Sequence, residues 1–137
     1  MNLLRRLFLN QKNLSVGQIG ENHACVFLKK KKYKILARNY SNVSGRRLGE
    51  IDIVAKDCDV IVFVEVKTRV GFPGDILPQE NITRGKMQKV ERIARAYLRE
   101  KGLLGVPHRF DAVCVWCRPV SHEIVHTEHV ESIFFDF

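Results

Sequence analysis

Two neighbouring runs of β-branched residues constrain the fold of this 137-residue chain more than any other feature. The segment Glu50–Ala55 alternates apolar and polar side chains, and Val60–Lys67 is rich in Val, as is typical of a strand buried on both faces. Four residues with turn chemistry, 56–59, separate the two runs. The pattern predicts an antiparallel hairpin in which Ala55 lies roughly opposite Val60.

The remaining periodicities predict two helices and three more strands around this hairpin. The expected helices are Ser15–Lys31, capped by Ser15, and Thr83–Lys101, and the other strands are Tyr33–Tyr40, His108–Trp116 and a shorter one near Glu123–Thr127. Three strands followed by a helix and a fourth strand allow a right-handed crossover. We therefore expect one α/β domain over residues 1–137, a three-layer sandwich with a mixed central sheet flanked by helices in the order αβββαββ. Residues 1–13 could instead form a flexible or self-association arm.

The charge of the chain is unusual, whereas its hydrophobicity is not. Hydrophobic residues make up 45% and charged residues 28% of the sequence, values that exclude a disordered chain and a membrane-embedded one. The net charge is +8, and the first 47 residues hold 11 Lys or Arg against one acid. Such basicity favours a polyanionic partner, either nucleic acid or an anionic membrane surface. Arg5 and Arg6 interrupt the apolar N-terminal residues, so we expect no membrane span and a cytoplasmic protein.

Charged residues interrupt the apolar hairpin at three positions. Glu65 and Lys67 share one face of the second strand, and their Cα atoms are about 7 Å apart at this spacing, so both side chains can reach one bound group. Asp52 interrupts the first strand, where β propensity disfavours an Asp. The expected register puts Asp52 near Phe63, or near Glu65 if a bulge shifts the pairing by one or two residues.

The first helix adds a further acid to this set. Glu21 lies on the inward-facing stripe of the helix and is the only acid among the first 47 residues. Glu21, Asp52 and Glu65 cannot all ionise close together without a cation, for which Mg²⁺ or Mn²⁺ is the natural choice. A structural ion pair explains any one of these residues more simply, but together they favour a site. Two carboxylates and a backbone carbonyl, here that of Val66, can hold a metal against a scissile phosphate, and Lys67 can orient or help deprotonate the attacking water.

Ordered motifs along the chain carry a family resemblance. They are Gly17-Gln18-Ile19-Gly20-Glu21, Gly49-Glu50-Ile51-Asp52-Ile53-Val54-Ala55, Val62-Phe63-Val64-Glu65-Val66-Lys67-Thr68-Arg69, Ala96-Tyr97-Leu98 and Arg109-Phe110-Asp111. In these motifs the chain resembles the YraN-like family of small, uncharacterised bacterial proteins over nearly its whole length. The Asp followed by Glu-x-Lys across a hairpin also resembles the PD-(D/E)xK nucleases, which include archaeal Holliday junction resolvases and share the restriction-endonuclease-like fold.

The nuclease resemblance implies a role for each matching residue. Asp52 and Glu65 correspond to the metal-binding acids, Lys67 to the catalytic lysine, and Glu21 to a first-helix acid that joins the metal shell through water. The implied activity is metal-dependent hydrolysis of phosphodiester bonds in structured or branched DNA, by a homodimer if the target is two-fold symmetric. The alternative is a non-catalytic nucleic-acid-binding or adaptor domain whose acids form a vestigial site.

Basic residues near these motifs are candidates for holding the nucleic-acid backbone. The candidates are Lys30, Arg46, Arg47, Arg69 and Lys86. Ordinary solvation of a helix or loop explains each of them about as well.

The predicted strand His108–Trp116 and the residues after it also carry metal-ligand chemistry. The residues with the spacing of a zinc site are Cys114, Cys117, His122, His126 and His129. Residues three apart on a strand face opposite ways, however, so burial as small hydrophobic residues is the better interpretation of the two thiols. On the same strand we expect Asp111 to pair with Arg109 or with a helix end rather than to bind metal.

Overall fold

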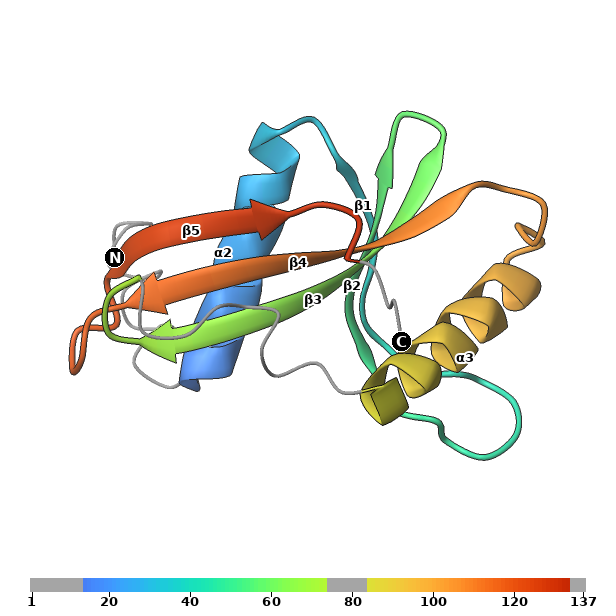
Figure 1. The fold of residues 1–137 in the computed structure, drawn as a ribbon, viewed down its shortest axis with the longest axis horizontal. Helices are drawn as coiled ribbons and strands as arrows, with labels where there is room; N and C mark the ends of the chain where they lie inside the picture. Colours follow the sequence, from blue (N-terminus) through green and yellow to red (C-terminus); the bar gives the residue numbers. More distant parts are fainter. Residues whose placement is uncertain (1–13, 74–83, 134–137) are drawn as a thin grey trace, which may run out of the picture.

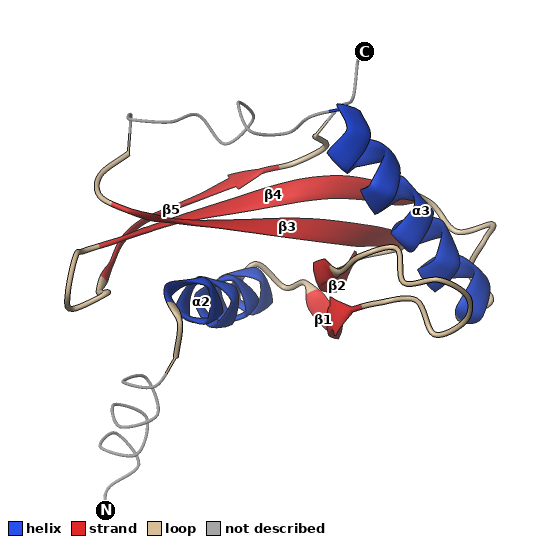
Figure 2. Cartoon of the chain, turned by 90° about the horizontal axis from the view of Figure 1, so that it is seen from below, coloured by secondary structure: helices blue, strands red, loops and turns tan. Residues whose placement is uncertain are grey.

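A five-stranded mixed sheet with one helix packed on each face forms the framework of the protein (Figure 1, Figure 2). The computed structural model describes residues 14–73 and 84–133. Its elements are α2 (Val16–Lys30), β1 (Lys34–Tyr40), β2 (Ile51–Asp57), β3 (Val60–Val70), α3 (Arg84–Glu100), β4 (His108–Cys117) and β5 (Ile124–Val130). The predicted element order and the mixed α/β class are confirmed for these residues. The expected arm at residues 1–13 lies outside them.

The strands lie side by side in their order along the chain. β1, β2 and β3 form an antiparallel meander, β3 and β4 are parallel, and β5 pairs antiparallel with β4. Because β3 and β4 are parallel, the chain has to cross over between them, and α3 lies in this crossover. The crossover brings the first turn of α3 to the middle of β3, where Lys86 contacts Glu65.

The β2–β3 hairpin turns on two residues, Cys58 and Asp59, rather than on the four residues expected from the sequence. Cys58 has a positive φ of 51°, the left-handed conformation that tight two-residue turns use. The polar residues 56–57 stay in the ladder, because its hydrogen bonds are made by backbone groups and not by side chains. Ala55 therefore pairs with Val62, two residues beyond the partner expected from the sequence.

Each helix covers its own apolar cluster. The cluster against α2 includes Ile53, Val62, Val64, Val113 and Val115, and the cluster against α3 includes Val54, Ile61, Phe63, Tyr97 and Leu98. Residues 61–64 of β3 alternate between the two clusters, so this part of the central strand is buried on both faces, as predicted. Figure 2 shows the two helices on opposite sides of the sheet.

The start of α2 agrees with the sequence prediction. The Ser15 hydroxyl accepts a hydrogen bond from the Gln18 N–H, and the Gln18 side chain accepts one from the Ser15 N–H. This reciprocal capping box satisfies two backbone donors at the helix terminus. Within the described parts of the chain, neither helix combines the length and the apolar composition that crossing a bilayer requires.

Candidate functional site

Asp52 and Glu65 lie just beyond the paired part of the β2–β3 hairpin, at the end farther from the turn. The last pair of the ladder is Ile53 with Val64, and each acid is the next residue along its strand. Oδ2 of Asp52 accepts a 2.8 Å hydrogen bond from the Val66 N–H. The short turn thus brings together the two acids that were predicted from the sequence to bind the metal, one from each strand.

The position of the half-buried Asp52 carboxyl is unfavourable for its negative charge. Its pKa is raised from 3.8 to about 7, mainly by burial and next by the charge of Glu65, with a smaller contribution from Glu21. The Val66 N–H and the Lys67 ammonium act in the opposite direction. The three acids and the lysine selected from the sequence therefore influence the charge state of one carboxyl group.

Two ammonium groups meet at one oxygen of Glu65. The Nζ atoms of Lys67 and Lys86 lie 3.3 Å and 3.0 Å from Glu65 Oε1. Burial lowers the pKa of Lys67, and the neighbouring Lys86 lowers it further. Burial also opposes the charge of Lys86, but its contacts with Lys67 and Glu65 outweigh burial and raise its pKa. Lys67 is therefore the weaker base of the pair.

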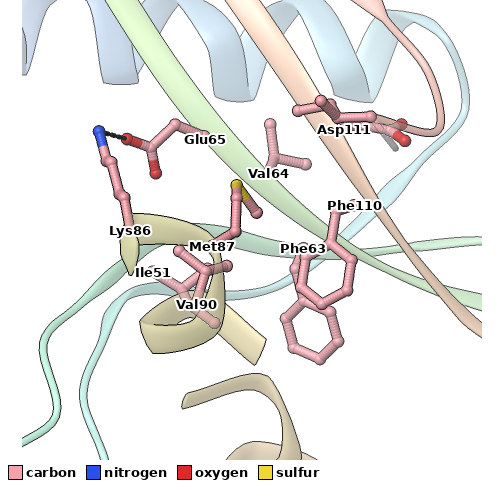
Figure 3. Close-up of a pocket in the computed structure, with 10 residues that line it drawn as sticks. Ile51, Phe63, Val64, Glu65, Lys86, Met87, Val90, Phe110 and Asp111 are labelled. Carbon is pink, nitrogen blue, oxygen red and sulfur yellow. Dashed lines mark ion pairs between the residues drawn. The ribbon is translucent and has the colours of Figure 1, made fainter. Parts of the chain in front are cut away.

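An apolar pocket adjoins the Glu65–Lys86 ion pair. Figure 3 shows Lys86 reaching from the first turn of α3 toward Glu65 on β3, with Met87 and Val90 of the same helix beside the pocket. Ile51, Phe63 and Phe110 complete much of its lining. The pocket places low-dielectric surface next to the charged groups, which strengthens their electrostatic interactions.

The donor set of the site suits a hard metal ion. Among residues 14–73 and 84–133, no three His, Cys, Asp or Glu side chains are close enough together to hold a metal by themselves. Glu21 is half-buried and makes no hydrogen bond or ion pair within those residues. The available donors are thus the carboxylates of Asp52 and Glu65 and the carbonyl of Val66. Oxygen ligands of this number fit Mg²⁺ or Mn²⁺, which usually keep several water ligands.

Helix α2 approaches β3 very closely beside these residues. A Cβ atom on Gly20 would lie 1.8 Å from Thr68 Oγ1 and 2.9 Å from Thr68 Cβ, so only Gly fits there. Gly20 precedes Glu21, and Thr68 follows Lys67, so this contact fixes the helix that carries the acid against the strand that carries the lysine. The sequence alone did not predict this contact. A Gly inside an amphipathic helix is the signal that could have revealed it.

The basic candidates are scattered, with one exception. Arg46 and Arg47 are exposed between β1 and β2, Lys30 is exposed at the end of α2, and Arg69 is half-buried on β3. Lys30 follows Glu21 by nine residues, which is about 13 Å along a helix axis. Lys86 is the candidate that contacts an acid of the site, Glu65. The sequence proposed Lys86 for phosphate binding but did not predict this ion pair.

A second polar cluster lies on the α2 face of the sheet, and we call it the Asp111 cluster. The fully buried Asp111 accepts hydrogen bonds from Arg109 Nε at 3.0 Å, as the sequence predicted, and from the Ser132 N–H at 2.9 Å. His129 Nε2 lies 2.8 Å from its other oxygen, and Arg109 continues to Asp57 at 3.1 Å. The hydroxyl of Tyr33 also accepts from Arg109 and completes the cluster.

The thiols of the possible zinc site behave as core residues. Cys114 and Cys117 are buried and free of disulfides. Burial raises the pKa of Cys114 to about 11, so this thiol stays protonated at neutral pH, whereas zinc binds the thiolate. His129 bonds Asp111 rather than either sulfur. The hydrophobic interpretation of the two cysteines therefore fits the structure.

Residues 20–115 match the family described as "Uncharacterised protein family UPF0102". A UPF0102 protein from Geotalea uraniireducens is 38% identical over 122 residues, which cover 89% of this chain and 91% of the relative. A UPF0102 protein from Pelotomaculum thermopropionicum is 40% identical over 119 residues, covering 87% and 94%. One from Moorella thermoacetica is 45% identical over 100 residues, covering 73% and 79%.

Proposed function

The chain belongs to the uncharacterised protein family UPF0102, and we propose that it is a metal-dependent endonuclease that hydrolyses phosphodiester bonds of structured or branched DNA. One observation carries the proposal: the Asp52 carboxylate on β2 is bonded to the N–H of Val66, between Glu65 and Lys67 on β3. This arrangement supports assignment to the PD-(D/E)xK nucleases. The αβββαββ order around a mixed sheet supports a restriction-endonuclease-like fold.

Each residue of the site has a chemical role in this proposal. Asp52, Glu65 and the Val66 carbonyl would hold Mg²⁺ or Mn²⁺, which when bound lowers the pKa of a water molecule and offsets charge on the phosphate. Lys67 orients the attacking water through Nζ, and its lowered pKa makes proton exchange with that water easier. Glu21 makes no hydrogen bond to Asp52 or Glu65 in the described chain. It acts on the site through water and through its charge.

The charge of the protein supports a nucleic-acid substrate. The net charge of +8 and the exposed Arg46 and Arg47 suit a phosphate backbone. A two-fold symmetric junction has two equivalent scissile phosphates, whereas one chain offers one site, so we propose that a homodimer acts on such a target. Light scattering should then show a dimer on a four-way junction, and a monomer on and off the DNA would contradict it.

A nuclease assay with matched variants tests the proposed function. Linear duplex, single-stranded, flap and four-way DNA are incubated with the protein and Mg²⁺ or Mn²⁺. We expect cleavage of the branched substrates and a loss of at least about 100-fold in Asp52→Asn, Glu65→Gln and Lys67→Met, since each removes a group that acts on the transition state. Glu50→Gln, which neutralises an exposed carboxylate two residues from Asp52, should retain activity. Cleavage unchanged in the Asp52 and Glu65 variants would belong to a contaminant and overturn the proposal.

A non-catalytic nucleic-acid-binding or adaptor domain is the second candidate function. It is favoured by the two ammonium groups that already neutralise Glu65. DNA binding with a steep salt dependence, no hydrolysis with any divalent ion and no binding of Mn²⁺ would select this function over the nuclease.

A further inference from the structure

The ammonium group of Lys86 lies where it competes with a divalent ion for Glu65. Its Nζ is 3.0 Å from Glu65 Oε1, the oxygen that Lys67 also contacts at 3.3 Å. Oxygen ligands bind Mg²⁺ at about 2 Å, so an ion on this carboxylate would lie within a few ångströms of both ammonium groups. Like charges at such a separation repel strongly at the edge of a protein interior. An ion that binds this oxygen of Glu65 therefore displaces at least one of the two lysines.

The two lysines differ in their freedom to move. The side chain of Lys67 is 14% exposed on the central strand β3, whereas that of Lys86 is 41% exposed on the first turn of α3. A partly exposed ammonium group exchanges a carboxylate partner for water at little cost in free energy, because water solvates the charge well. Lys86 is thus the lysine that moves away from Glu65 when an ion binds.

We infer that Lys86 is a positioning residue that neutralises Glu65 in the metal-free protein, leaves it when Mg²⁺ or Mn²⁺ binds, and then contacts a backbone phosphate of the DNA. This inference rests on the metal site of the proposed function. It adds that metal binding controls whether Lys86 is available to bind DNA. In the metal-free protein Lys86 is held by Glu65 and contributes little to DNA binding. Ion binding releases this cation at the rim of the site, so the ion and the DNA strengthen each other's binding.

Titration of Mn²⁺ by calorimetry into the metal-free protein tests the competition. Lys86→Met removes the ammonium group but keeps the aliphatic stem and a good helix former. Lys89→Met is the matched control, since Lys89 is an exposed lysine one turn further along α3. We expect Lys86→Met to bind Mn²⁺ about twofold to fivefold more tightly than the wild type, the range for loss of one partly exposed ion pair, and Lys89→Met to bind it like the wild type.

The outcomes separate this inference from the proposed function. Equal or weaker Mn²⁺ binding by Lys86→Met overturns the competition and leaves the metal site intact. Absence of Mn²⁺ binding in all three proteins overturns both the inference and the metal site. Binding by Lys86→Met alone supports the inference, because the lysine then blocks the site fully in the wild type.

Fluorescence anisotropy of a labelled four-way junction tests the transfer of Lys86 to phosphate. Ca²⁺ replaces Mg²⁺ so that hydrolysis does not disturb the measurement. The factor by which Ca²⁺ tightens DNA binding should be at least about threefold smaller in Lys86→Met than in the wild type, and unchanged in Lys89→Met. An unchanged factor in Lys86→Met would overturn the phosphate contact. Melting curves of both variants without metal verify that the fold is retained.

Discussion

At the scale of a single residue, the negative charge of Asp52 lowers the stability of the fold, although the proposed metal site needs that charge. The Asp52 pKa of about 7 in the folded protein lies well above the ordinary value of 3.8, so the folded state holds the proton more tightly than the unfolded chain. The stability contributed by protonated Asp52 is complete below about pH 4 and is lost as the pH rises through about 7. At neutral pH and above, the metal-free protein therefore carries a charge that weakens its fold, and a bound cation would relieve it.

Asp52→Asn should stabilise the metal-free protein above pH 7. The amide has a similar shape, can accept the Val66 hydrogen bond and does not ionise. As the pH rises from 5 to 8, the free energy of unfolding of the wild type, measured with urea, should fall by about 1 to 2 kcal/mol relative to that of the variant. This amount is already reduced for solvent screening. Asp59→Asn, at the exposed turn, is the control and should follow the wild type. A difference between Asp52→Asn and the wild type that does not change with pH would contradict the raised pKa.

At the scale of elements, the contact of α2 with β3 sets the geometry of the site. Gly20 is the point of closest approach, and the residue after it, Glu21, acts on Asp52 through its charge. Any side chain at Gly20 would force α2 away from Thr68 and displace Glu21 from the sheet. The helix is thus positioned by backbone approach rather than by a bond from its acid.

Two glycines of α2 provide a direct comparison. Gly20→Ala should destabilise the protein by about 1 to 3 kcal/mol, since its Cβ would overlap Thr68. Gly17→Ala should be neutral or stabilise the protein by up to about 0.5 kcal/mol, because Ala favours the helix and the nearest atom lies 3.9 Å away. Thermal unfolding of both variants measures the difference. Equal effects at the two positions would show that α2 does not pack on β3 as closely as described.

The sequence predicted the elements better than the contacts between them. Alternation and helical periodicity are local, so the order of elements and the two-sided burial of β3 could be read directly. The hairpin register could not be predicted in this way, because it depends on the left-handed conformation of Cys58, which the residue type does not indicate. The direction of the error is informative, since the shorter turn pairs Ile53 with Val64 and leaves Asp52 and Glu65 as the next residue on each strand.

The same distinction applies to the candidate site. The local sequence places Asp52 and Glu65 toward the same end of one hairpin, but the turn length that brings them together had to come from the structure. The ion pair of Lys86 with Glu65 depends on how the crossover helix packs on the sheet, and the contact of His129 with Asp111 depends on the pairing of β5. Neither arrangement leaves a periodic signal in the sequence.

At the scale of the whole molecule, the Asp111 cluster and the charged groups around Glu65 have opposite properties. The Asp111 cluster lies on the α2 face and joins β2, β4, the end of β5 and the residue before β1. The described residues contain no buried side-chain donor or acceptor without a partner, and Asp111 has three partners. On the α3 face, Glu65 shares one oxygen between two lysines. The first arrangement suits stability, and the second suits exchange of ligands.

Asp111→Asn should test this division of roles. Burial opposes the charge of Asp111, but hydrogen bonds from His129, Arg109 and the Ser132 N–H outweigh burial and lower its pKa. The carboxylate therefore contributes stability above the ordinary pKa of 3.8, and this contribution is lost as the pH falls through the lower folded-state value. At pH 7 the free energy of unfolding of the variant, measured with urea, should be about 3 kcal/mol lower than that of the wild type, because the substitution breaks a buried, hydrogen-bonded charge pair.

The control for Asp111→Asn is Glu123→Gln, which breaks the exposed pair with Arg118 and should cost less than about 1 kcal/mol. A loss as small as that of the control would mean that the Asp111 cluster does not hold the strands together. Because the cluster and the lysine pair lie on opposite faces of the sheet, Mn²⁺ affinity should be the same in folded Asp111→Asn as in the wild type. A large change in that affinity would instead show that the two clusters are coupled through β3 and β4, whose parallel pairing puts Asp111 beside Val64, the residue before Glu65.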